Sequence, residues 1–170
     1  MEKQTVIFRD LGNVDYQAAW EYQEKLLKQN VRKKSEAGDV KDGEDIADSG
    51  TMHYLLFVEH PPVYTLGKSG NKENVLLNDE ELKEKNIQFF STNRGGDITF
   101  HGNDQIVGYP ILDLEKFYTD IGRYLRNLEE VIILTLEEYG IKGERSAGET
   151  GVWIDTATRG KERKICAIGV

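Results

Sequence analysis

The chain has 170 residues, of which 38% are hydrophobic and 31% are charged, a composition typical of a folded globular protein and not of a disordered one. Its formal net charge of −8 argues against a nucleic-acid partner, because phosphate recognition requires clustered Lys and Arg. One cysteine excludes an internal disulfide, and no apolar run is long enough to cross a membrane, so we expect a cytoplasmic protein without a membrane partner.

The first elements are an extended run and an amphipathic helix. Thr5 to Arg9 predicts a strand, and residues 10–13 predict a turn. Asp15 is placed to cap a helix that runs from Tyr16 to about Gln29 with one apolar face. The polar tract from Val31 to Gly50 has no sustained apolar period, so we expect a mobile surface loop there, inside a single domain of residues 1–170.

The middle of the chain predicts several strands and one short helix. His60-Pro61-Pro62 interrupts the extended region, because proline cannot donate to a strand ladder. Asn78 is placed to cap a helix from Asp79 to Lys85, with Glu81 at the position of a capping-box acid. The predicted extended segments are Tyr54–Glu59, Val63–Leu66, Ile87–Ser91 and Gln105–Leu114, the last with Pro110 as an edge or bulge position.

The last part of the chain predicts a long helix and a hairpin. The helix begins near Thr119 or Asp120 and ends before Gly140, with an apolar stripe at Ile121, Leu125, Leu128, Ile132 and Tyr139. The hairpin pairs Gly151–Ile154 with Lys164–Val170. Strands and helices mix without regular βαβ alternation, which favours an α/β or α+β fold. The apolar strand that ends at Val170 leads us to expect a domain that is incomplete at its C-terminus.

The nine residues Arg94-Gly95-Gly96-Asp97-Ile98-Thr99-Phe100-His101-Gly102 are the most distinctive stretch. The two glycines allow positive φ and close approach of a ligand or another backbone. The alternation after Gly96 predicts a strand with Ile98 and Phe100 on one face and Thr99 and His101 on the other. Taken alone, the stretch is either a glycine turn before an ordinary strand or the wall of a binding site.

Lys164, Cys166 and His101 are candidates for chemistry. Lys164 and Cys166 lie two apart on one strand, where an ammonium beside a thiol could activate a nucleophile. The alternatives are a solvated basic turn for Lys164 and a small buried hydrophobe for Cys166. No geometry ties His101 to an acid, so a catalytic triad is not indicated. One cysteine and three scattered histidines are also a poor fit to a structural zinc site, and we expect neither a metal nor a cofactor.

Four segments, in order along the chain, resemble the octanoyltransferase family of lipoate biosynthesis. The strongest is Arg94–Gly102, followed by Gln105 and Tyr109-Pro110. The others are Glu59-His60-Pro61-Pro62-Val63-Tyr64-Thr65-Leu66-Gly67, Gly151-Val152-Trp153 and Lys164-Ile165-Cys166-Ala167-Ile168-Gly169. The sequence departs from the family at Asn103-Asp104, where the family more often has Pro-Gly.

The resemblance implies a biotin/lipoate-protein ligase-like α/β fold with a mixed sheet. It implies transfer of an octanoyl group from acyl carrier protein to a lysine of lipoyl domains, in 2-oxoacid dehydrogenase complexes and the glycine cleavage H protein. Lys164 is implied as the catalytic lysine that lowers the pKa of the nucleophile. That nucleophile is implied to be a cysteine beyond Val170, not Cys166. The implied substrate-binding residues are Arg94, Gly95, Gly96, Asp97, Ile98, Thr99, Phe100, His101, Ala167, Ile168 and Gly169.

Two other functions stay open at this point. An ATP-dependent lipoate-protein ligase has a comparable glycine segment with a histidine, and Asn103 keeps that alternative in view. A module that binds an acyl chain or its carrier without catalysis is the second. In the transferase interpretation His101 lines the pocket and is not a general base.

Overall fold

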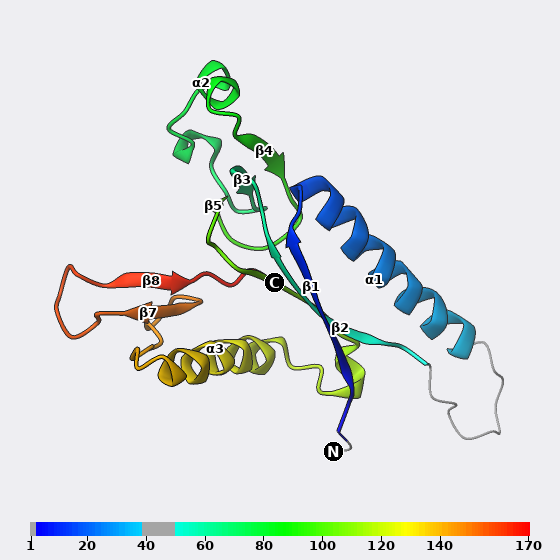
Figure 1. Ribbon diagram of the computed structural model, residues 1–170. Helices are drawn as coiled ribbons and strands as arrows, with labels where there is room; N and C mark the ends of the chain where they lie inside the picture. The colour runs from blue at the N-terminus through cyan, green and yellow to red at the C-terminus, as the bar shows by residue number, and fades with distance from the viewer. Residues whose placement is uncertain (1–2, 39–49) are drawn as a thin grey trace. The chain divides into compact units, whose positions relative to one another are not determined.

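The computed structural model describes residues 3–38 and 50–170 (Figure 1). Their contacts divide the chain into two units. The N-terminal unit comprises residues 1–93 and 97–117, and the C-terminal unit comprises residues 94–96 and 118–170. The glycine stretch is therefore shared, because residues 94–96 belong to the C-terminal unit and Asp97 onward to the N-terminal one. The single domain expected from the sequence stays a prediction.

The first sheet of the N-terminal unit has the strand order β1-β2-β6. β1 (Val6–Asn13) is parallel to β2 (His53–Glu59), and β6 (Val107–Ile111) is antiparallel to β2. A parallel pair needs a crossover, and α1 (Tyr16–Gly38) provides it. The core between helix and sheet comprises Leu26, Tyr54 and Leu56, with Ile7, Leu11, Tyr22, Tyr109 and Ile111 packed around them.

The second sheet of this unit has the order β4-β3-β5. Its central strand β3 (Val63–Leu66) is parallel to β4 (Gln88–Ser91) and antiparallel to β5 (Ile98–His101). The 3₁₀ turn η1 (Lys72–Asn74) and α2 (Asp79–Glu84) connect β3 to β4. The predicted capping box of α2 is confirmed, because Asn78 and Glu81 bond each other's backbone. A further 3₁₀ turn, η2 (Leu114–Lys116), follows β6.

The C-terminal unit contains α3 (Ile121–Glu138) and the antiparallel hairpin of β7 (Val152–Ile154) and β8 (Arg163–Cys166). Asp120 caps α3, and Gly140 follows it with φ 71°, as the sequence predicts. The strand predicted to continue to Val170 ends at Cys166. β7 is short, and its first residue Val152 already pairs with Cys166, so residues 167–170 have no partner in β7.

Two expectations for the N-terminal unit are wrong. Residues 10–13, predicted as a turn, form the end of β1, and the register shift between Asp10 and Asn13 accommodates Gly12 at φ 66°. The helix predicted to end near Gln29 continues to Gly38, so the first part of the expected loop is helical. The remainder of that loop, residues 39–49, lies outside the described residues.

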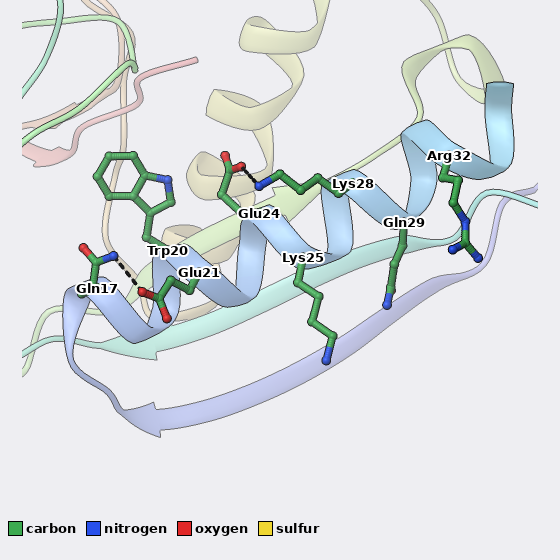
Figure 2. A pocket seen from close by; sticks show the side chains of 8 residues that line it. All are labelled: Gln17, Trp20, Glu21, Glu24, Lys25, Lys28, Gln29 and Arg32. Atoms are coloured by element: carbon green, nitrogen blue, oxygen red, sulfur yellow. Dashed lines mark hydrogen bonds and ion pairs between the residues drawn. The ribbon is translucent and has the colours of Figure 1, made fainter.

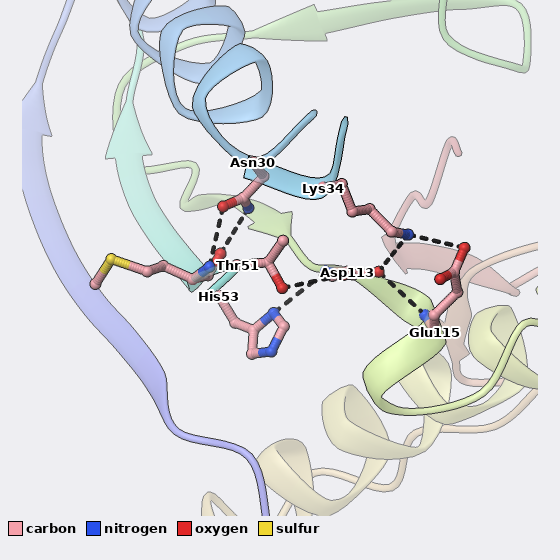
Figure 3. A network of polar contacts seen from close by, with 7 residues as sticks. Asn30, Lys34, Thr51, His53, Asp113 and Glu115 are labelled. Carbon is pink, nitrogen blue, oxygen red and sulfur yellow. Dashed lines mark hydrogen bonds and ion pairs between the residues drawn. The ribbon is translucent and has the colours of Figure 1, made fainter. Parts of the chain in front are cut away.

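Polar anchors explain the longer helix, because apolar periodicity alone would end it earlier (Figure 3). Asn30 donates to Met52 O at 2.6 Å and accepts from Met52 N at 3.0 Å. Lys34 Nζ lies 2.9 Å from Asp113 Oδ1 and 2.8 Å from Glu115 Oε1. These contacts fasten the C-terminal half of α1 to the start of β2 and to η2.

The apolar stripe of α3 differs from the prediction at both ends. Ile121 is 54% exposed and Tyr139 is 78% exposed, whereas Glu129 in the middle of the helix is fully buried.

No described helix combines the length and hydropathy that a membrane crossing needs.

Candidate active site

The glycine stretch and the C-terminal segment meet backbone to backbone inside the C-terminal unit. A Cβ added to Gly95 would lie 2.9 Å from the carbonyl oxygen of Val170, and one added to Gly169 would lie 3.0 Å from that of Gly95. A Cβ at Gly95 would force the backbone to shift, and one at Gly169 would be tighter than ordinary contacts, so the two segments pack closely because both residues are glycine. The structure thus brings together Arg94–Gly96 and the end of the Ala167–Gly169 segment, which the sequence assigned to one pocket.

Arg94 folds back onto its own loop. Its Nη1 donates to the carbonyl oxygen of Gly95 at 2.8 Å, and its side chain passes Gly169. Gly96 has φ 86°, in the region that favours glycine, and a Cβ there would meet Arg94 Nη1 at 3.3 Å. At least one guanidinium donor therefore holds the loop.

Asp97, in the N-terminal unit, holds the loop that follows β3. Its carboxylate accepts from Asn71 N at 3.1 Å and from Asn74 Nδ2 at 2.7 Å, and its carbonyl oxygen accepts from Gly67 N at 3.1 Å. Gly70 fits beside it because a Cβ there would lie 2.4 Å from Leu66 Cδ1. The observed contacts of Asp97 give it a positioning role in the loop.

The two faces of β5 predicted from the alternation differ in burial. Thr99 lies opposite the fully buried Thr65 on β3, so Thr99 and His101 share the more buried face. Phe100 is 44% exposed and its ring lies 5.0 Å from that of Tyr64. Alternation predicted two faces correctly, but the polar one is turned toward the protein interior and the apolar one is more open.

His101 is held among aromatic rings. Its Nδ1 is 2.6 Å from Gln105 Oε1, and because an amide oxygen only accepts, Nδ1 carries the proton. Nε2, then an acceptor, lies 3.5 Å from Thr65 Oγ1. The ring stacks on Tyr16 at 6.4 Å and lies 5.8 Å from His60. These contacts fix the position of the His101 ring, and its role as a pocket-lining residue stays a prediction.

His60, to which the sequence analysis gave no functional role, lies beside His101. It is fully buried, its Nδ1 donates to Val14 O at 2.8 Å, and its Nε2 accepts from the Tyr109 hydroxyl at 2.8 Å. Burial lowers the pKa of His60, against the opposing effects of the Val14 carbonyl and the Asp15 carboxylate. A neutral imidazole therefore fixes one wall of the cluster that holds His101.

Lys164 lies on β8 opposite Trp153 of β7. Its Nζ is 4.8 Å from the centre of the Trp153 ring and 3.3 Å from Glu149 Oε2, and its side chain is 33% exposed. The ammonium is therefore held over an aromatic face and beside a carboxylate. The catalytic role of Lys164 stays a prediction.

Cys166 is a poor nucleophile in this setting. Burial raises the pKa of its thiol, the carboxylate of Glu129 adds to that effect, and Lys164 opposes it. The thiol is therefore protonated near neutral pH, and a thiol is far less nucleophilic than a thiolate. This agrees with the expectation that Cys166 is a strand residue.

The sequence analysis did not predict the buried carboxylate of Glu129 and the two arginines that pair with it. Glu129 Oε1 accepts from Gly151 N at 3.0 Å, while Oε2 accepts from Arg145 Nε at 3.0 Å and pairs with Arg126 Nη1 at 2.9 Å. Gly151 has φ 109°, and a Cβ there would lie 2.2 Å from the carbonyl oxygen of Cys166. The spacing in the sequence does indicate the face of α3 on which Glu129 lies, because Glu129 follows Leu125 by four residues and so shares the apolar face.

A hollow lies along α1 and is lined by that helix alone (Figure 2). Its residues are mostly polar: Gln17, Trp20, Glu21, Glu24, Lys25, Lys28, Gln29 and Arg32. Lys28 and Glu24 form an ion pair of 3.1 Å there. It contains none of the predicted site residues, and its charged lining does not suit an acyl chain.

Comparison with known proteins agrees with the resemblance. The model of the lipoyl protein ligase A/B catalytic domain matches residues 15–170. The chain belongs to this family.

Among curated members of the family, the octanoyltransferase of Christiangramia forsetii is 57% identical over 162 residues, covering 95% of this chain and 67% of that protein. The octanoyltransferase of Flavobacterium johnsoniae is 58% identical over 162 residues, with the same coverage of 95% and 67%. The chain thus spans about two thirds of the length of these relatives.

Similar solved structures confirm the fold. The bi-partite lipoate protein ligase of Thermoplasma acidophilum superposes with a TM-score of 0.57 at 12% identity, covering 96% of this chain and 54% of that one. LipL1 of P. falciparum, in complex with lipoate, gives a TM-score of 0.58 at 12% identity, covering 89% and 41%. The predicted lipoate-protein ligase-like α/β fold is therefore confirmed.

Proposed function

We propose that this protein transfers an octanoyl group to a lysine of lipoyl domains, with octanoyl-acyl carrier protein as donor. The observation that carries the proposal is the glycine contact between Arg94–Gly96 and Gly169–Val170. Glycine-rich backbone can present N–H groups to a developing oxyanion, which acyl transfer requires. The identity of 57% to an octanoyltransferase supports this reaction in preference to others of the fold.

The proposed chemistry has two acyl transfers. A cysteine thiolate attacks the thioester carbonyl, a new C–S bond forms, and the carrier thiol leaves with a proton. The acceptor lysine amine then attacks the acyl-enzyme, so that an amide forms and the cysteine thiol is released. Because the environment of Cys166 disfavours its thiolate, we assign the nucleophile to a cysteine outside these 170 residues.

Lys164 is the proposed catalytic residue of this unit. An ammonium near the nucleophile favours its thiolate and can pass a proton to the leaving thiol. Glu149 and the Trp153 ring hold Lys164 in place. The thioester end of the substrate is assigned to the residues of the C-terminal unit, Arg94, Gly95, Gly96, Ala167, Ile168 and Gly169. Residues 97–101 remain predicted substrate-binding positions.

The proposed partners are acyl carrier protein as donor and, as acceptors, the lipoyl domains of 2-oxoacid dehydrogenase complexes and the glycine cleavage H protein. The Thermoplasma acidophilum ligase was studied together with its E2 lipoyl domain, which supports an acceptor of this class for a protein of the same family. The cytoplasm is the proposed site of action.

The test is incubation of the protein, as its gene encodes it, with octanoyl-acyl carrier protein and a lipoyl domain in the absence of ATP. We expect the acceptor to gain one octanoyl amide by mass spectrometry. Modification that instead requires ATP and free octanoate or lipoate would replace the transferase by a ligase. Binding of the acyl carrier without any modification would leave an acyl-binding module.

A further inference from the structure

Residues 149–153 contact β8 and the segment that follows it in the C-terminal unit. Glu149 Oε2 lies 3.3 Å from Lys164 Nζ, and Thr150 Oγ1 donates to the carbonyl oxygen of Ile168 at 3.4 Å. The last two residues of the segment belong to β7 and pair with β8, one of them with Lys164 itself. The 149–153 segment therefore supports both the proposed catalytic lysine and a predicted substrate-binding residue.

Gly151, in the middle of this segment, is fixed from outside it. Its φ is 109°, and a Cβ there would lie 2.2 Å from the carbonyl oxygen of Cys166, so only glycine fits. The register of β7 on β8 shifts between Val152 and Trp153, directly after it, so strand pairing alone does not set the spacing there. What holds Gly151 is its N–H, which donates to Glu129 Oε1 at 3.0 Å.

The carboxylate of Glu129 is a rigid anchor for that bond. It is fully buried, and its other oxygen, Oε2, lies 3.0 Å from Arg145 Nε and 2.9 Å from Arg126 Nη1, so it cannot turn without breaking these contacts. Replacing a buried ion pair by apolar residues is often neutral or stabilising, so stability alone does not account for a carboxylate here. An acceptor for the Gly151 N–H is what an apolar side chain would not supply.

We infer that Glu129 is a positioning residue for acyl transfer, which fixes the 149–153 segment through the Gly151 N–H and thereby places the Lys164 ammonium. The inference rests on the proposed function and extends it, because Glu129 acts through other residues and not on the substrate. The four-carbon stem of lysine is flexible, so its supports decide where the ammonium lies. A misplacement of about 1 Å caused far from the chemistry can slow a reaction about 100-fold.

Single-turnover acylation separates positioning from stability. The protein, as its gene encodes it, is mixed with a saturating excess of octanoyl-acyl carrier protein, and the octanoyl-enzyme is followed by mass spectrometry after rapid quenching. The amplitude counts the folded molecules, whereas the rate constant describes each of them. A residue with a structural role alone lowers the amplitude and leaves the rate constant unchanged.

The variants differ in what they offer to Gly151. Glu129→Met has a side chain of similar length without a carboxylate oxygen, and we expect its rate constant to fall at least about 10-fold. Glu129→Gln retains an oxygen for the Gly151 N–H and should recover most of that loss. Glu130→Ala is the matched control, because Glu130 pairs with the same Arg145 at 2.6 Å, and it should keep the wild-type rate constant.

Glu129→Asp guards against a Glu129→Met variant that does not fold. It keeps the charge between the two arginines, but its shorter side chain draws the carboxylate away from Gly151, so we expect its rate constant to fall as well. A wild-type rate constant in Glu129→Asp would overturn the inference and leave the transferase in place.

The remaining outcomes also decide the matter. Equal slowing in Glu129→Gln and Glu129→Met would overturn the inference, because the Gly151 contact would then not be the cause. A lowered amplitude with an unchanged rate constant in Glu129→Met would reduce Glu129 to a structural residue. If the wild-type protein forms no octanoyl-enzyme, the proposed function itself is contradicted, and the inference falls with it.

Discussion

Two buried carboxylates fasten a helix to a strand in this protein, one in each unit. Asp113, with a side chain 4% exposed, accepts from Lys34, from Thr51 at 3.0 Å and from the backbone N–H of Glu115 within η2. Glu129, fully buried, accepts from two arginines and from Gly151 N. Both follow the rule that a buried charge must be paired and hydrogen-bonded.

The difference lies in what each carboxylate holds. Asp113 joins the end of α1 to the start of β2, where none of the predicted site residues lies. Glu129 joins α3 to Gly151, directly before the strand that carries Trp153 and opposite Cys166. Similar local chemistry therefore supports the scaffold in one unit and the candidate site in the other.

Loss of the Glu129 carboxylate should have the largest effect on the stability of the fold. In Glu129→Ala two guanidinium groups lose their shared partner and Gly151 N–H loses its acceptor, so we expect the free energy of unfolding to fall by about 3–5 kcal/mol. Urea denaturation followed by Trp153 fluorescence in a Trp20→Phe background measures this. Glu130→Ala is the control: its more exposed carboxylate pairs with Arg145 at 2.6 Å and should matter by less than about 1 kcal/mol. Equal effects for the two variants would contradict the role of Glu129.

Lys164 should affect chemistry and not stability. Its ion pair with Glu149 is partly exposed and contributes less than about 1 kcal/mol, so Lys164→Ala should melt close to wild type. We expect octanoyl transfer to slow by about 100-fold, as is typical when a proton-transferring group is removed. The neighbouring Arg163→Ala, which loses only the pair with Asp155, should retain the rate. A wild-type rate in Lys164→Ala would remove this lysine from the site.

Asp113 should affect stability and not binding. Burial opposes ionisation of Asp113, but the contacts from Lys34, Thr51 and Glu115 N together hold its pKa below the ordinary value of 3.8. A lowered pKa in the folded state means that the stabilisation is present above the unfolded pKa and is lost as pH falls through the folded one.

For Asp113→Asn we therefore expect a loss of about 1–3 kcal/mol at pH 7 that shrinks below about pH 4, with unchanged thioester binding. Denaturant unfolding at several pH values measures it. A loss of the same size at pH 3 and pH 7 would show that the carboxylate charge is unimportant.

Substitution of Cys166 should have the smallest effect on transferase activity. We expect Cys166→Ser to retain most transferase activity, because the buried thiol is not the proposed nucleophile. In the wild-type protein the alkylation rate of Cys166 should rise with pH. The midpoint of that rise should lie above the ordinary thiol pKa of 9.0, since burial and Glu129 raise the pKa of Cys166. Glu129→Gln should lower that midpoint and Lys164→Ala should raise it further. An octanoyl adduct on Cys166 itself would overturn the assignment.

Local signals were read correctly wherever a few adjacent residues settle the structure. The sequence predicts Asp15 and Asn78 as helix caps and a helix start near Thr119 or Asp120. The side chains of Asp15, Asn78 and Asp120 each accept from the first turn of their helix. Capping depends on residues within four positions, so tertiary contacts rarely overrule it. The family segments could likewise be recognised from the order of their residues.

Burial was not predictable in the same way. Alternation in Ile98–His101 indicated two faces of β5, yet the buried one carries Thr99 and His101, because Thr65, Tyr16 and His60 lie against it. The polar half of α1 was interpreted as a loop, since its anchors on Met52 and Asp113 are distant in sequence.

The sequence by itself determined the helix caps, most strands and the family, because these depend on neighbouring residues and on their order. Only the tertiary structure decided that Glu129 is buried, that its carboxylate accepts from Gly151 N, and that Gly95 lies against Val170. The physical reason is that periodicity specifies which side chains share a face, whereas what covers that face depends on residues far along the chain.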